Sequence, residues 1–182
     1  NAAGSFSVNK FHADLKSQGV AVGKDTLHDY LGYLEDAFLL RSLTIASDSE
    51  RRRHVNPRKV YPVDTGLIPM FDRSGKTNLG HALETAVLLE LERRGAETAY
   101  MRTEGGFEVD FFARLPDGRE ELLQVCASLD DPATRAREIR ALQDAATQYP
   151  RAGRRLIAFD APPAFAMPRG ITFTRAAEWL LS

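Results

Sequence analysis

The segment between residues 79 and 159 restricts most strongly what this chain can fold into. A helical repeat of apolar residues is followed by three β patterns in a row, then by a second helical repeat and one more β pattern. Elements in this order predict an α/β (α+β) fold in which helices flank a mixed sheet. The expected helices cover residues 79–94 and 130–148, and the expected strands cover residues 97–102, 107–115, 121–127 and 155–159.

Two short helices are predicted before this segment. Ser7 can cap the first helix, and Gly19 can end it, because glycine adopts the left-handed backbone of a helix stop without strain. Asp25 or Thr26 can cap the second helix, which continues to about residue 38 with a 3.6-residue apolar period. The residues expected to pack the two helices together are Phe11, Leu15, Leu27, Leu31 and Leu34.

The residues after the second helix complete the pattern of a helix-turn-helix with a wing. An apolar strand is expected around residues 39–45, and the polar, arginine-rich stretch 47–59 is expected to form the wing as a loop. The sequence therefore predicts an N-terminal winged-helix segment over residues 1–72 and an α/β domain over residues 73–182. The boundary between them is placed in the loop 72–78.

The composition excludes several classes of protein. The chain has 24 basic and 25 acidic side chains, so a nucleic-acid contact has to come from a local patch and not from the overall charge. The single cysteine, Cys126, excludes an internal disulfide framework and fits a reducing compartment. No apolar stretch reaches the length of a membrane span, and no signal-peptide pattern opens the sequence. We therefore expect a cytoplasmic protein with no membrane partner.

Two fragments resemble part of a phosphate-binding P-loop. Residues 19–25 read GVAVGKD, which is one residue short and places Asp25 where the Mg²⁺-binding hydroxyl belongs. Residues 74–77 read SGKT, but Met70 stands where the opening glycine is required. Because the complete glycine-rich turn is needed to aim backbone amides at phosphates, neither fragment predicts nucleotide binding. We expect no cofactor and no ATPase activity in this chain by itself.

Two carboxylates fall at positions suited to a metal-dependent site. Glu84 lies on an otherwise apolar helical stripe, where a buried charge is costly without a partner. Asp110 lies in the segment FEVDFF, and alternation places it on the same face as Glu108. On the next strand, Gln124 and Cys126 share one face. A helix acid, a strand Asp and an x-V-x group on the neighbouring strand form the arrangement of restriction-endonuclease-like nucleases, which hold Mg²⁺ with acids and position water with a lysine.

Four ordered sequence blocks carry a resemblance to a known family. The blocks are TLHDYLGYLEDAFLL (26–40), RKVYPVDTGL (58–67), LGHALETAVLLEL (79–91) and FEVDF (107–111). Over roughly residues 6–160 the chain resembles the domain of unknown function that follows the AAA-type ATPase domain in many prokaryotic ATP-binding proteins. The resemblance implies a winged-helix part and a nuclease-like part. It also implies an ATPase domain of the same longer chain as partner, with ATP and Mg²⁺ bound only there.

The resemblance breaks down at the second strand of the nuclease-like site. The family's Glu and Asp match Glu84 and Asp110, but where many relatives read EVK this chain has Gln124, Val125 and Cys126. Glutamine is a poor substitute for an anionic ligand, and cysteine supplies no cation. We therefore expect a remnant site without a tightly bound metal, whose acids pair with arginines or accept hydrogen bonds from backbone amides. The alternative is a metal-dependent DNA nuclease that uses Glu84 and Asp110 in an atypical active site.

The strongest basic cluster lies in the expected wing, where it could contact nucleic-acid phosphates. The alternative is a solvated loop, or a surface that docks the ATPase domain or another protein. The second helix argues against strong DNA reading, because its acidic residues outnumber its basic ones. The cluster consists of Arg51, Arg52, Arg53, Arg58 and Lys59.

Two further groups have simpler interpretations. Cys126 is expected to be a buried strand residue, because the four histidines are remote in sequence and offer it no nearby base. The charged residues of the helix 130–148 predict a salt-bridged face toward solvent. These residues are Arg135, Arg137, Glu138, Arg140 and Asp144. The leading hypothesis is thus a non-catalytic accessory module that docks its ATPase domain, a protein partner or nucleic acid.

Overall fold

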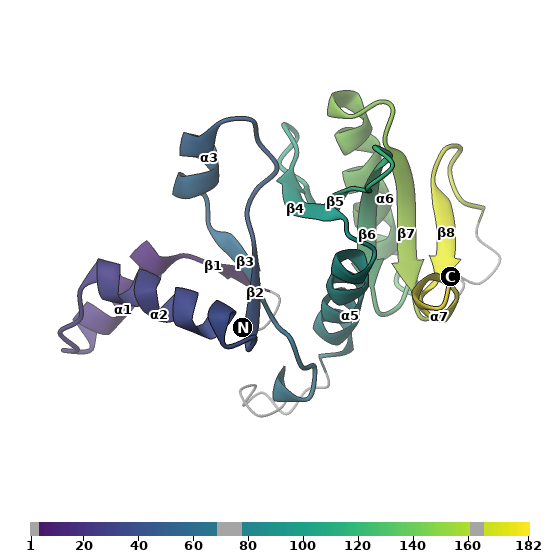
Figure 1. The fold of residues 1–182 in the computed structure, drawn as a ribbon. Coiled ribbons are helices and arrows are strands. Elements are labelled where there is room, and N and C mark those ends of the chain that lie inside the picture. Colours follow the sequence, from purple (N-terminus) through teal and green to yellow (C-terminus); the bar gives the residue numbers. More distant parts are fainter. Residues whose placement is uncertain (1–3, 69–77, 161–165) are drawn as a thin grey trace. The chain divides into compact units, whose positions relative to one another are not determined.

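A computed structural model describes residues 4–68, 78–160 and 166–182 of the 182-residue chain. The chain has a mixed α+β architecture and divides into two compact units, residues 1–77 and 78–182 (Figure 1). Most of the loop in which the sequence places the domain boundary lies outside the described residues. None of the helices in the described part of the chain combines the length and apolar character that crossing a membrane requires.

The first unit contains a small antiparallel sheet and short helices (Figure 1). Its elements are β1 (Gly4–Phe6), α1 (Val8–Ser17), α2 (Lys24–Asp36), β2 (Leu40–Leu43), α3 (Glu50–Val55) and β3 (Arg58–Pro62). Strand β3 lies in the centre of the sheet and pairs with β1 on one side and β2 on the other. Helix α2 contacts both α1 and β2, so the helices are held against this sheet at one end.

The predicted ends of the first helix are confirmed. Ser7 precedes α1, and its Oγ accepts a hydrogen bond from the backbone N of Lys10 at 3.4 Å. Gly19 follows the helix with a φ of +80°, the left-handed conformation that favours glycine. The predicted cap of the second helix at Asp25 or Thr26 is wrong, because α2 already begins at Lys24 and has a glycine at its N-cap.

The two helices of the first unit share one small buried cluster. It consists of Val8 of α1 and Leu27 and Leu31 of α2, and Leu15 packs against it as predicted. Phe11 and Leu34, which the sequence also places in this interface, are 41% and 40% exposed. Helix α2 therefore carries more apolar surface than the described part of the chain covers.

The prediction of a loop across the arginine-rich stretch is wrong for residues 50–55, which form helix α3. Ser49 caps this helix, with its Oγ accepting from the backbone N of Arg52 at 3.3 Å. Glu50 stands in the first turn, where the helix dipole favours an acid. The end of the stretch then enters β3. The winged-helix interpretation consequently loses the irregular wing on which it was partly based.

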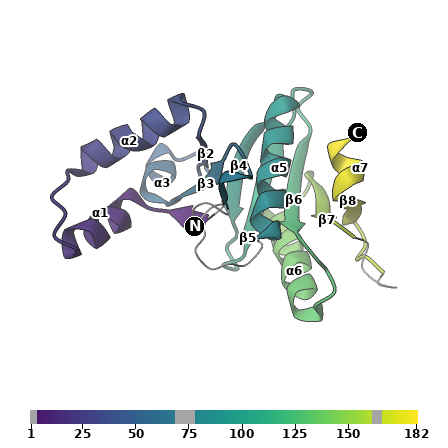
Figure 2. The same cartoon turned by 90° about the horizontal axis from the view of Figure 1, so that it is seen from below.

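The second unit is built on a five-stranded mixed sheet (Figures 1 and 2). Its elements are α5 (Leu79–Arg93), β4 (Glu97–Arg102), β5 (Glu108–Arg114), β6 (Glu120–Cys126), α6 (Pro132–Gln148), β7 (Gly153–Ala158), β8 (Thr172–Arg175) and α7 (Ala176–Leu180). The strands lie in the order β4-β5-β6-β7-β8. Strands β4, β5 and β6 are antiparallel, whereas β6, β7 and β8 are parallel. The predicted antiparallel pairing of β5 with β6 is thus confirmed, together with the helix α5 that packs on them.

Helices α5 and α6 cover opposite faces of this sheet (Figures 1 and 2). Phe112 of β5 points toward α6, where its ring centroid lies 4.4 Å from that of Tyr149. Gln124 of β6 points the same way and contacts Glu138 of α6. Because side chains alternate along a strand, the fully buried Phe111 points to the other face. Asp110 and Gln124 therefore lie on the α6 side of the sheet, whereas Glu84 is contributed by α5.

The end of α5 is joined to α7 by charged groups. The carboxylate of Glu90 accepts hydrogen bonds from Arg93 at 2.6 and 2.7 Å and from Nε of Arg94 at 2.7 Å. Arg94 also donates to the carbonyl oxygen of Trp179 and lies over its ring, 4.2 Å from the centroid. The hydrogen bonds from Arg93 lower the pKa of Glu90 to about 2, helped by Arg94 and opposed by burial.

Candidate functional site

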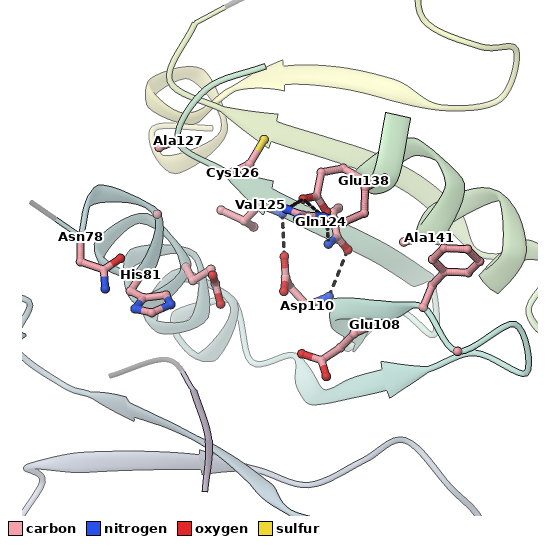
Figure 3. A pocket seen from close by; sticks show the side chains of 15 residues that line it. Asn78, His81, Glu108, Asp110, Gln124, Val125, Cys126, Ala127, Glu138 and Ala141 are labelled. Atoms are coloured by element: carbon pink, nitrogen blue, oxygen red, sulfur yellow. Dashed lines mark hydrogen bonds and ion pairs between the residues drawn. The ribbon is translucent and has the colours of Figure 1, made fainter. Parts of the chain in front are cut away.

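A cavity of about 470 Å³ opens where β5 and β6 meet the start of α5 and the middle of α6 (Figure 3). All four residues of the predicted remnant site line this cavity, namely Glu84, Asp110, Gln124 and Cys126. Glu84 comes from α5, and the other three come from the strands. The structure thus brings together side chains from three elements, α5, β5 and β6.

Asp110 fastens β5 to β6 at the point where their backbone pairing ends. The ladder between the strands runs as far as the pair Phe111 and Leu123. Beyond it, Oδ2 of Asp110 accepts a hydrogen bond from the backbone N of Val125 at 3.0 Å. The backbone N of Asp110 donates to Oε1 of Gln124 at 3.2 Å. Side chains therefore take over the role of the missing backbone hydrogen bonds, as Figure 3 shows by dashed lines.

The amide of Gln124 connects this strand pair to helix α6. Its Nε2 donates to Oε2 of Glu138 at 2.5 Å, while its Oε1 accepts from Asp110. The other oxygen of Glu138 accepts from Nη2 and Nε of Arg137 at 2.6 and 3.1 Å. Glu138 is 5% exposed, so this chain of hydrogen bonds is buried for most of its length. A glutamine can bridge the two groups because it carries a donor and an acceptor on one side chain.

The prediction that the charged face of helix 130–148 points to solvent is wrong for Glu138, whereas Arg137 and Arg140 are exposed as predicted. Glu138 is buried in the site, and Arg137 lines the same cavity. Asp144 accepts a hydrogen bond from the backbone N of Gly105 at 3.1 Å. The guanidinium of Arg140 lies 6.0 Å from the centroid of the Phe107 ring. Sequence analysis missed Glu138 as a site residue, and its only signal was an acid placed among apolar positions of the helix.

Cys126 lies at the inner edge of the cavity as a buried thiol, as expected. Burial, together with the negative charges of Glu138 and Asp110, raises its pKa to about 12, against the weaker effect of Arg137. A thiol with this pKa is almost fully protonated near neutral pH. Cys126 is therefore unsuited to act as a nucleophile near neutral pH.

More acidic than basic side chains line the cavity, but the carboxylates are not gathered around one point. Glu84, Glu108, Asp110 and Glu138 line it together with Arg137. Within the described residues, no three His, Cys, Asp or Glu side chains are grouped closely enough to hold a metal ion. Figure 3 shows Asp110 turned toward Val125 and Glu138 turned toward Gln124. The side chains thus contact one another and do not converge on a common centre.

The predicted basic cluster is only partly on the surface. Arg51 and Arg52 of α3 are exposed. Arg58 donates to Oγ of Ser42 at 3.2 Å, so its guanidinium is engaged within the unit. Lys59 is 4% exposed and therefore does not belong to a surface that could meet phosphates.

Arg53 of the same cluster is also engaged within the first unit, since it donates to the carbonyl oxygen of Ser47 at 2.6 Å.

The structure describes one of the two P-loop-like fragments. Residues 19–23 lie in the connection between α1 and α2, and residues 24 and 25 begin α2. Residues 74–77 lie outside the described part of the chain.

Comparisons with known proteins give one match to a domain of unknown function and one similarity to an uncharacterized archaeal protein. Residues 1–77 match the model of a domain of unknown function, DUF8612, whose limit coincides with the end of the first unit. Over 146 residues the chain is 32% identical to "Uncharacterized protein MJ1544" of Methanocaldococcus jannaschii. The alignment covers 79% of the chain and 32% of the relative, so the chain spans about a third of that protein's length. No solved structure gives a significant match.

Proposed function

We propose that this chain is a non-catalytic accessory module of an AAA-type ATP-binding protein. In this proposal the first unit is a winged-helix variant, and the second is a restriction-endonuclease-like domain whose active site has become a structural network. ATP and Mg²⁺ belong to the ATPase domain of the longer protein, which is also the main partner. The observation that carries the proposal is the Gln124 amide, which joins Asp110 to Glu138 and occupies the position of an acidic metal ligand.

The order of elements supports the assignment of the second unit. A helix, three antiparallel strands, a helix and a parallel strand follow one another, with the polar residues gathered where β5 and β6 separate. A nuclease built this way needs carboxylates free to bind Mg²⁺ and a cation near the attacking water. In this chain Asp110 accepts from the backbone N of Val125, and a protonated thiol takes the place of the lysine. These substitutions favour a structural role.

The sheet of the first unit supports the winged-helix variant. Two helices precede a β2–β3 pair, and the sheet order is β1-β3-β2. The segment between β2 and β3 carries α3, which presents Arg51 and Arg52 outward. Because the fold alone does not fix a partner, these two arginines are assigned to docking of protein or nucleic acid without sequence reading.

A cleavage assay tests the proposal directly. The purified chain is incubated with supercoiled plasmid and with Mg²⁺ or Mn²⁺, and nicked and linear products are measured over time. We expect no cleavage above the rate of the Asp110→Asn variant. Cleavage by the natural chain that disappears in Asp110→Asn would overturn the non-catalytic assignment.

A metal-dependent DNA nuclease is the second candidate, and one observation favours it. The strand lacks an acid at Gln124 and a cation at Cys126, but α6 supplies Glu138 and Arg137 to the same cavity. If this exchange preserved activity, Glu138→Gln and Arg137→Ala would abolish cleavage as completely as Asp110→Asn. The assay above therefore includes these two variants, with Glu104→Gln as an exposed control.

A further inference from the structure

Helix α2 presents an apolar surface that its own unit leaves uncovered. Tyr30, Tyr33 and Leu34 are 55%, 64% and 40% exposed, and the centroids of the two tyrosine rings lie 6.4 Å apart. Residues spaced by three and four positions share one side of a helix. This side adjoins the buried stripe of Leu27 and Leu31. The apolar face of α2 thus extends beyond the part that packs in the first unit.

Phe38 extends this surface at the cost of an unfavourable backbone. The turn after α2 closes with hydrogen bonds from Leu39 N to Leu34 O and from Phe38 N to Glu35 O, both 3.0 Å long. This pattern places Phe38 in the left-handed position that glycine normally occupies, and its φ is +57°. Its side chain is nevertheless 69% exposed. A bulky residue is strained in this conformation, and among the described residues the Arg41 guanidinium lies 5.2 Å from its ring centroid.

The charges beside the surface select the kind of partner. Asp29 and Asp36 are exposed and lie four residues before and three residues after Tyr33, so they border one edge of the surface, while Arg41 is a base that lies at its Phe38 end. A second copy of the chain would bring these acids against the same acids. Nucleic-acid phosphates would be repelled in the same way. A helix with apolar residues on one side and basic residues along the edges is complementary to both features.

We infer that the surface formed by Tyr30, Tyr33, Leu34 and Phe38, the α2 surface, docks an amphipathic helix with basic flanks from the ATPase part of the longer protein. The inference rests on the proposed accessory function and adds the face and the chemistry of its partner. About two thirds of the archaeal relative lies outside the aligned region, which leaves ample chain to supply such a helix. The binding mode is the insertion of helix side chains at positions i, i+3, i+4 and i+7 against an apolar face.

Peptide binding tests the chemistry of the α2 surface. Two fluorescein-labelled 18-residue helical peptides share one leucine face, and the other positions are lysine in one peptide and glutamate in the other. We expect the leucine–lysine peptide to bind in a fluorescence-anisotropy titration, and the leucine–glutamate peptide to bind at least tenfold more weakly. Tyr33→Ser should weaken binding of the leucine–lysine peptide about tenfold. Val55→Ser removes a similarly exposed apolar side chain from α3 and should leave the affinity for this peptide unchanged. Equal binding of both peptides, or no effect of Tyr33→Ser, would overturn the inference.

A second variant separates docking from folding. Phe38→Gly should raise the melting temperature of the first unit by about 4 °C, because glycine fits the left-handed turn. The same variant should weaken binding of the leucine–lysine peptide about tenfold, because it removes an aromatic contact. A loss of affinity in a more stable protein cannot come from unfolding. A variant that is stabilised and binds the peptide as tightly as the natural chain would exclude Phe38 from the docking surface.

Hydroxyl-radical footprinting tests the source of the helix. In the natural polypeptide at its full length, oxidation of Tyr30 and Tyr33 should be at least fivefold slower than in the 182-residue chain. Val55 should be oxidised equally in both. Equal oxidation of the tyrosines would rule out a helix from the longer protein as the occupant. Plasmid cleavage is measured independently, so a failure of the docking inference is distinguishable from a failure of the proposed non-catalytic function.

Discussion

Nε2 of Gln124 donates a hydrogen bond to Oε2 of Glu138 across 2.5 Å, which ties the central strand of the second unit to the helix that covers it. The same glutamine accepts from the backbone of Asp110, so one side chain spans two strands and a helix. The cavity beside it is lined by groups that hold one another in place. A change of charge at any of these groups should therefore lower the stability of the second unit.

Removal of Glu138 should destabilise the second unit. Glu138→Ala leaves the Gln124 amide and the Arg137 guanidinium without their acceptor, and the expected loss in unfolding free energy is about 1–3 kcal/mol. Urea unfolding followed by the fluorescence of Trp179 reports this unit, because the chain has a single tryptophan. Glu104→Ala, at an exposed position of the β4–β5 turn, should change stability by less than about 0.5 kcal/mol. Equal stability of both variants would contradict a structural role for Glu138.

Restoring the missing strand acid should be unfavourable without metal. Gln124→Glu replaces the amide donor by a carboxylate that faces Glu138, so we expect a loss of about 2–4 kcal/mol at pH 7. Addition of Mn²⁺ should recover part of this loss if the scaffold still allows the acids to converge on one ion. Gln143→Glu makes the same chemical change at an exposed position of α6. This variant should neither lose stability nor be stabilised by Mn²⁺. Melting temperatures with and without Mn²⁺ measure both effects.

The thiol of Cys126 should resist modification in the folded chain. Its pKa, which burial raises from 9.0 to about 12, lowers the thiolate fraction at pH 8 by about a thousandfold, and the strand also shields the sulfur. We expect Ellman's reagent to label the protein in urea within minutes and to leave the folded protein unlabelled over the same time. Prompt labelling of the folded chain would show that the cavity opens far enough to admit the reagent.

The pH dependence of stability should contain a contribution from Glu90. Its pKa in the folded state is about 2, below the ordinary value of 4.5, so its ion pairs stabilise the fold above pH 4.5. This stabilisation is lost as the pH falls from about 4.5 through about 2. Glu90→Gln should lower stability at pH 7 by about 1 kcal/mol and flatten the change below pH 4.5. Glu104→Gln serves as the control, and acid unfolding that is identical in the two variants would contradict the assignment.

The sequence was sufficient for the elements that combine regular periodicity with clear turns. Helix α5 and strands β5 and β6 follow from their apolar patterns, and alternation correctly placed Asp110 with Gln124 on one side of the sheet. Helix α3 was missed because its arginines suggested a loop, although Ser49 followed by Glu50 is a helix-start signal. A capping signal of two residues is easily outweighed by the composition of the segment around it.

The partners of the site residues could not be derived from the sequence alone. Glu138 reaches Gln124 only because α6 crosses over β6 before the parallel strand β7, and this placement depends on packing of the whole unit. Phe38 gave no signal either, since glycine and not phenylalanine marks a left-handed turn. Both residues break a local rule, and both lie where the structure suggests a role beyond folding.

The mixed pairing of β6 also sets an order of assembly during protein synthesis. Its antiparallel neighbour β5 precedes it by a short turn, so residues 79–126 can pair as soon as they leave the ribosome. The parallel neighbour β7 is added only after α6 has been made, and β8 follows at the end of the chain. Asp110 and Gln124 are therefore synthesised before Glu138, whose carboxylate later accepts the hydrogen bond from the Gln124 amide. A nascent chain arrested before residue 132 should hold a half-built cavity, with the amide of Gln124 facing water.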